Sequence, residues 1–116
     1  MGLFHIKERL TGPTRRVEDV DFLVDINATL SVVPQSLAEK LELKSARSQS
    51  VVIAGGHRDV WPVTEARSAL NGTEVTTPCF IAPDGPPLLG AVALESLFLA
   101  VDPVGKRLIP VDGFVG

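Results

Sequence analysis

The dipeptide Asn71-Gly72 constrains the fold more than any other feature of the chain, because it separates two long strand-like runs. Asn-Gly between such runs is a strong signal for a tight β-hairpin turn. Residues 60–70 and 74–82 are therefore predicted to form one long antiparallel hairpin. Pro62 interrupts the first of these strands, and a proline restricts that part of the strand to a sheet edge or a bulge.

Most of the remaining chain also has the pattern of β-strands. Further strands are expected over residues 3–10, 17–24, 51–53 and 107–111, with a polar loop at 45–50 before the third of them. Two short helices are expected over residues 35–41, following Pro34, and over residues 91–98. The predicted fold class is all-β with two short helices.

Composition limits the possible functions. The 116 residues predict a single domain, 1–116. The net charge of -3 argues against nucleic-acid binding, which needs a basic face.

The single cysteine, Cys79, excludes an internal disulfide. The first ten residues carry charges where a signal peptide needs an apolar core, and no apolar run is long enough to span a membrane, so a cytoplasmic protein is expected.

A weak internal repeat divides the sequence into two similar halves. Residues 22–24 precede a loop, an apolar pair and a helix with Leu37 and Leu41. Residues 80–82 precede a loop, the apolar pair Leu88-Leu89 and a helix with two further leucines. Each half therefore has the predicted order strand, loop, strand, helix.

Asp25 stands between the two apolar runs of the segment FLVDINATLSVVP, residues 22–34. A buried carboxylate is costly unless it is hydrogen-bonded, paired or neutral. One interpretation is structural, with Asp25 accepting hydrogen bonds from the backbone N–H groups of the loop at 26–29. The other is catalytic, with Asp25 as an active-site carboxylate at a turn between two strands.

The segment Leu23-Val24-Asp25, followed by residues 28–34 and a helix, resembles the active-site segment of retropepsin-like aspartic proteases, particularly the small bacterial and archaeal members. Residues 53–59 look like the flap hairpin of that family, and residues 87–90 before a helix look like its second hallmark. Residues 102–111 are similar to its closing strand. The resemblance extends over about residues 3–111, and its motif positions include Ile26, Thr29, Leu88, Leu89 and Gly90.

This resemblance implies a closed β-barrel that acts as a homodimer on a peptide or protein substrate. Catalysis would use Asp25 from each copy to activate a water, because two neighbouring carboxylates can act as base and acid. No metal or organic cofactor is expected. The second half has Pro83 at the place corresponding to Asp25, with Asp84 one step out of phase. The substrate-binding residues implied by the resemblance are Asn27, Ala28, Ile53, Ala54, Gly55 and Gly56.

The chain departs from the family motif at two positions beside the aspartate. Ile26 stands where the family has threonine or serine, and Asn27 stands where it has glycine. Isoleucine cannot form the hydrogen bond that the family's hydroxyl makes across the dimer. The site either works with an unusual loop, or belongs to a disabled pseudo-protease that serves as a dimeric peptide-binding or assembly module, or carries deliberate changes.

Other catalytic sites have little support in the sequence. His5 and His57 are the only histidines, and they have no spacing typical of a zinc site. A hydrolase triad from Ser31 or Cys79 with His57 would require a coincidence of folding. Cys79 is expected to be a small core residue, and His57 an exposed turn residue.

Overall fold

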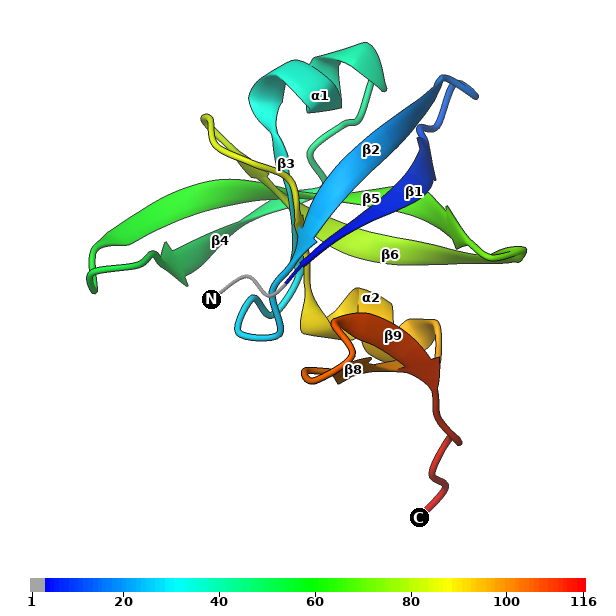
Figure 1. The fold of residues 1–116 in the computed structure, drawn as a ribbon. Coiled ribbons are helices and arrows are strands. Elements are labelled where there is room, and N and C mark those ends of the chain that lie inside the picture. Colours follow the sequence, from blue (N-terminus) through cyan, green and yellow to red (C-terminus); the bar gives the residue numbers. More distant parts are fainter. Residues whose placement is uncertain (1–3) are drawn as a thin grey trace.

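The structure is a computed structural model that describes residues 4–116 (Figure 1). Leu3, at the start of the first predicted strand, lies outside the described residues. The elements are β1 (His5–Thr11), β2 (Val17–Val24), β3 (Ser31–Pro34), α1 (Gln35–Lys40), β4 (Arg47–Val52), β5 (Arg58–Leu70), β6 (Thr73–Ala82), β7 (Leu88–Leu89), α2 (Ala91–Ser96), β8 (Leu99–Asp102) and β9 (Arg107–Pro110). The prediction of a mainly β fold with two short helices is confirmed.

The strands form one large sheet and one small sheet. Seven strands pair in the order β1-β2-β7-β3-β6-β5-β4, and β8 pairs with β9 alone. The first strand, β1, pairs with β5 as well as with β2. The hydrogen-bonded order of six strands therefore returns to its starting point, and β4 extends it beyond β5.

The hairpin of β5 and β6 forms as the sequence predicts. Asn71 and Gly72 have φ values of 51° and 82°, and the residues on either side of them pair across the hairpin. Pro62 lies opposite Ser48 of β4, in the part of β5 before its pairing with β6 begins at Val63. At Pro62 the strand has a neighbour on one side only, so the missing N–H does not interrupt the sheet.

Strand β4 begins earlier than the sequence pattern suggests. Residues 45–50 were expected to be a loop, but Arg47–Val52 pairs with β5 over its whole length. Most of these side chains are exposed and polar, with only Val51 partly buried. A strand that buries neither face lacks the alternation of apolar and polar residues by which strands are predicted. The expectation of a loop was therefore wrong for residues 47–50.

Both helices end earlier than the sequence predicts. The first ends at Lys40 rather than at residue 41, and the second ends at Ser96 rather than at residue 98. Phe98 has a φ of 53°, which turns the chain into strand β8, an element that the sequence pattern did not reveal. No helix within residues 4–116 is long and apolar enough to cross a membrane.

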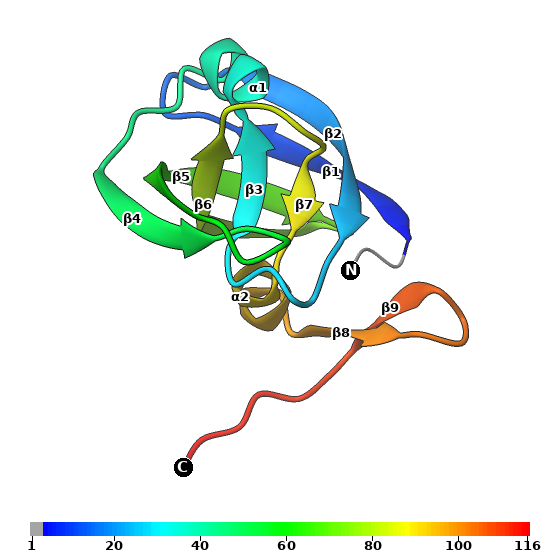
Figure 2. The ribbon, with the colours of Figure 1, turned by 90° about the vertical axis from the view of Figure 1, so that its left-hand side faces the viewer.

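The two halves of the internal repeat exchange strands. Strand β2 of the first half pairs in parallel with β7 of the second, and β6 of the second half pairs in parallel with β3 of the first. Figure 2 shows β3, β6 and β7 side by side, with α1 and α2 at opposite ends of them. The weak repeat in the sequence therefore corresponds to a repeat in the structure.

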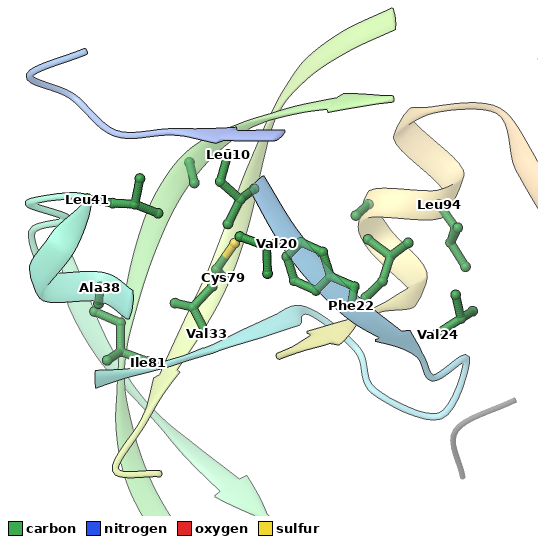
Figure 3. Packing of buried hydrophobic residues seen from close by; sticks show 13 residues of the cluster. Leu10, Val20, Phe22, Val24, Val33, Ala38, Leu41, Cys79, Ile81 and Leu94 are labelled. Carbon is green, nitrogen blue, oxygen red and sulfur yellow. The ribbon is translucent and has the colours of Figure 1, made fainter. Parts of the chain in front are cut away.

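The core lies inside the large sheet and joins the two halves (Figure 3). Alternate residues of β2 point inward, namely Val20, Phe22 and Val24. They meet side chains from the other strands and from both helices, including Leu10, Val33, Leu41, Cys79, Ile81, Leu89 and Leu94. Because β2 is fixed by this packing, the loop that follows Val24 is held at its base.

Candidate active site

Asp25 begins the loop between β2 and β3. Its backbone N–H donates to the Leu89 carbonyl over 3.0 Å, which extends the pairing of β2 with β7 by one step. The Asn27 N–H donates to Oδ1 of Asp25 over 3.0 Å, and the Ala28 N–H donates to the Asp25 carbonyl over 3.1 Å. The side chain thus caps its own loop, and this hydrogen bond holds one carboxylate oxygen in a defined position.

The start of α2 supports the same loop from the other half of the chain. The Ala91 N–H donates to the Ala28 carbonyl over 2.8 Å, and the Val92 N–H donates to the Thr29 carbonyl over 3.1 Å. The Gly90 N–H donates to the buried Ser31 Oγ over 3.1 Å. Backbone N–H groups of the first helical turn have no partner within a helix, and here they bind the loop carbonyls instead.

A groove of about 610 Å³ lies beside Asp25. Its lining comes from the Asp25 loop, from β3, from the β4 end of the hairpin and from single residues of β5, β6 and β7. These residues are Asp25, Asn27, Ala28, Thr29, Leu30, Val32, Ser50, Val51, Val52, Ile53, Ala54, Trp61, Phe80 and Leu88. A carboxylate in an otherwise largely apolar groove is suited to chemistry on a bound ligand.

The turn between β4 and β5 contributes Ile53 and Ala54 to the lining of this groove. The Ile53 N–H donates to the His57 carbonyl over 2.8 Å, and the Gly56 N–H donates to the Ile53 carbonyl over 2.9 Å. Gly55 and Gly56 have φ values of 94° and 85°, in the region that glycine adopts most easily. The two glycines therefore define the tip of a tight projecting hairpin, as the sequence predicts.

Most of the predicted site residues meet at the groove. Asp25, Asn27, Ala28, Thr29, Ile53, Ala54 and Leu88 all line it. Gly55 and Gly56 lie in the turn beyond Ala54 and are absent from the lining. Leu89 and Gly90 are buried behind the loop, and Ile26 points to the exterior with 51% of its surface exposed.

The groove also contains residues that the sequence did not assign to it. Trp61 and Phe80 contact edge to face there, with ring centroids 6.2 Å apart and an angle of 74° between the rings. The Trp61 Nε1–H donates to Asp59 Oδ2 over 3.0 Å. Phe80 pairs with Val32 through the parallel contact of β3 with β6. The registers of β3 and β5 with β6 bring Trp61, Phe80 and Val32 together, and the sequence pattern does not specify these registers.

The other candidate chemistries receive no support. Cys79 is buried, and burial together with the nearby Glu8 raises the pKa of its thiol to about 12, so it remains a thiol in the core. His57 lies exposed in the turn. Within the described part of the chain, no group of three or more histidine, cysteine, aspartate or glutamate side chains is placed to hold a metal ion.

Comparison with known proteins identifies the family and the fold of the chain. The sequence profile of the aspartyl protease family matches residues 11–93. No curated protein matches the sequence. Among solved structures, EIAV protease in complex with an inhibitor is similar, with a TM-score of 0.65, 18% identity and 90% of each chain covered. Simian foamy virus protease is also similar, with a TM-score of 0.58, 15% identity, and coverage of 80% of this chain and 93% of that one. The chain therefore belongs to the aspartyl protease family and has the retropepsin-like fold.

Proposed function

We propose that this protein is an aspartic endopeptidase that cleaves peptide bonds as a homodimer. The observation that carries the proposal is the position of Asp25 on the lining of a groove that Ile53 and Ala54 of the β4–β5 turn also line. An extended peptide would occupy the groove, with its side chains against apolar residues such as Trp61 and Phe80.

A second copy of the chain is proposed because one chain offers a single suitable carboxylate. Asp84, the acidic residue nearest to the equivalent place in the second half, is exposed and lies outside the groove lining. Its loop, between β6 and β7, lies at the end of the sheet opposite to the Asp25 loop (Figure 2). A pair of carboxylates would therefore require Asp25 of one copy to approach Asp25 of another about a two-fold axis.

The proposed reaction uses a water molecule held between the two Asp25 carboxylates. One carboxylate would accept a proton from the water as it attacks the peptide carbonyl carbon, while the protonated partner would donate to the carbonyl oxygen. Collapse of the tetrahedral intermediate would break the C–N bond, with the first carboxyl group giving its proton to the leaving nitrogen and the second carboxylate taking a hydroxyl proton from the intermediate. The Asn27 N–H would help by holding Oδ1 of its own Asp25 in place.

The test is cleavage of a peptide library from acid to neutral pH by four forms of the protein, each checked for dimer formation by sedimentation. These are the parent chain, Asp25→Asn, Asp84→Asn and the double variant Ile26→Thr, Asn27→Gly. We expect the parent chain and Asp84→Asn to cleave with an acid optimum, and Asp25→Asn to be inactive. Asp84→Asn is the matched control, because it removes an exposed carboxylate from the equivalent loop.

Two results would overturn the proposal. Cleavage by the double variant but not by the parent chain would identify the parent chain as a disabled form of the protease. Equal cleavage by the parent chain and Asp25→Asn would show that Asp25 serves only as the cap of its loop, and that the observed activity has another source.

A further inference from the structure

Glu8 is a buried carboxyl group that does not line the groove of the proposed reaction. It lies on β1 between Ile6 and Leu10, on the face of the strand that points inward, and only 2% of its surface is exposed. Glutamate is almost never fully buried unless it is paired with another group. Its position therefore requires an explanation that the peptidase activity does not provide.

The contacts of Glu8 suit a neutral carboxylic acid better than a carboxylate. The Ser68 hydroxyl donates to Glu8 Oε1, whereas Oε2 has no hydrogen-bond partner in the described part of the chain. An ionised carboxylate needs several donors when it leaves water. Burial raises the pKa of Glu8 above its usual value of 4.5, and the hydrogen bond from Ser68 acts in the opposite direction.

No positive charge faces Glu8 from the elements packed around it. On β5, the inward residues near it are Thr64, Ala66, Ser68 and Leu70, none of which is charged. Strand β6 contributes Cys79, whose thiol is neutral, α1 contributes Ala38, and Leu41 follows directly after α1. The inward face of β2 contributes half-buried Glu18, which is also acidic. Lys7 and Arg9 are exposed on the opposite face of β1.

The hydrogen bond between Glu8 and Ser68 connects β1 to β5 at a short junction. These two strands pair over three residues only, Arg9 with Ala69, Leu10 with Ser68 and Thr11 with Arg67. This pairing returns the strand order of the large sheet to β1. A charge on Glu8 would therefore lie beside the pairing of β1 with β5, which includes few backbone pairs.

We propose that Glu8 is held as a neutral carboxylic acid, hydrogen-bonded to Ser68 across the junction of β1 and β5, and that loss of its proton places an uncompensated charge in the core and makes the fold sensitive to alkali. The folded chain keeps the proton at a pH where the unfolded chain has released it. The stabilisation from Glu8 is therefore complete below the usual glutamate pKa of 4.5 and is lost as the pH rises through the higher pKa of the folded state.

The junction is connected to the active-site loop through β1. The carbonyl of Phe4, the residue before β1, accepts a hydrogen bond of 2.8 Å from the N–H of Val24, the residue before Asp25. Movement of β1 would thus release one support of the Asp25 loop. The same ionisation would loosen the fold and the groove together, at a pH above the usual glutamate pKa.

The test is urea unfolding from about pH 4 to about pH 9 at one chain concentration, with the parent chain, Glu8→Gln and Glu65→Gln. For the parent chain we expect the unfolding equilibrium constant to rise by up to about tenfold per pH unit above the usual glutamate value, since one proton is released on unfolding. Glu8→Gln should remove this rise. Glu65→Gln, which changes an exposed residue of β5, should retain it.

A second measurement decides the matter if Glu8→Gln does not fold. Infrared spectra of the folded parent chain, recorded from the usual glutamate pKa of 4.5 upward, should contain the band of a buried protonated carboxyl group, and this band should disappear as Glu8 loses its proton. Ser68→Ala should shift that band, because the Ser68 hydrogen bond is lost, and should move its loss to higher pH. A pH dependence of unfolding that is the same in the parent chain and Glu8→Gln, or a parent chain without the band, would overturn the inference. Neither result depends on peptide cleavage.

Discussion

Gly90 lies directly against the backbone of Leu30: a β-carbon placed on Gly90 would be 2.5 Å from both the carbonyl carbon and the carbonyl oxygen of Leu30. No real side chain fits at this distance, and the obstacle is backbone rather than a movable side chain. The glycine therefore allows α2 to start close enough to hold the Asp25 loop through Ala91 and Val92.

Gly90→Ala is expected to lower the free energy of unfolding by about 1–3 kcal/mol, because the extra carbon overpacks a buried contact. The same change should displace the Asp25 loop and reduce peptide cleavage. Urea unfolding and a cleavage assay measure the two effects. Ala91→Gly, which changes one carbon at the next residue, is expected to cost less than about 1 kcal/mol. Equal stability of Gly90→Ala and the parent chain would contradict this account of the glycine.

Ser31→Ala is expected to destabilise the protein by about 1–3 kcal/mol, because the buried Gly90 N–H loses its acceptor. The loop should remain in place through its other hydrogen bonds, so stability should fall more than activity. Thermal unfolding tests the first effect and peptide cleavage the second. Ser36→Ala, on the exposed side of α1, provides the control and should leave both unchanged. A stable Ser31→Ala variant would mean that the Gly90 N–H finds another acceptor.

Gly56→Val is expected to disrupt the tip of the β4–β5 hairpin, because Gly56 has a φ of 85° and a β-branched residue resists that conformation. The strain is about 1–2 kcal/mol, and it should appear as faster hydrogen exchange of the Ile53 and Gly56 amides. Ala54→Val adds the same side chain to the turn at a residue without positive φ and should leave the exchange unchanged. Unchanged exchange in Gly56→Val would show that the turn adopts another form without cost.

Phe80→Ala is expected to weaken peptide binding by roughly three- to tenfold, beyond the effect of lost surface area, because Trp61 loses its edge-to-face partner in the groove. Trp61 is the only tryptophan of the chain, so its fluorescence reports binding directly. The titration is best performed with Asp25→Asn, so that the peptide stays intact. Val17→Ala, on the exterior of β2, should bind normally. Equal affinities of the Phe80→Ala and Val17→Ala forms would place the peptide elsewhere.

The sequence predicts those parts of the fold that have local signals. Asn71-Gly72 specifies its hairpin because both residues adopt positive φ without help from the rest of the protein. Strand β4 carries no comparable signal, since its polar residues are exposed on both faces. Strand β8 is hidden for a different reason: Leu99–Asp102 continues the apolar run of the preceding helix, and only the turn at Phe98 separates them.

The residues of the candidate site also differ in whether local sequence signals predict them. Asp25 and the glycine turn can be found from short motifs, because each is a local feature of the chain. Trp61, Phe80 and Val32 come together through the register of three strands that are distant in sequence. The presence of Glu8 in the core is likewise decided by long-range packing, since in the sequence it has the alternation of an ordinary strand. A single-domain organisation and a cytoplasmic location remain predictions.

The exchange of strands between the two halves sets a condition on how the chain folds during synthesis. Strands β2 and β3 emerge early, but their parallel neighbours β7 and β6 belong to the second half. Parallel pairing between distant segments must wait until both are available, and such contacts form slowly. A ribosome-bound first half therefore has no complete sheet to adopt, and its apolar strands stay open to chaperones or proteases. The hydrogen bonds that hold the Asp25 loop come from residues 88–92, so they can form only after these residues have been synthesised.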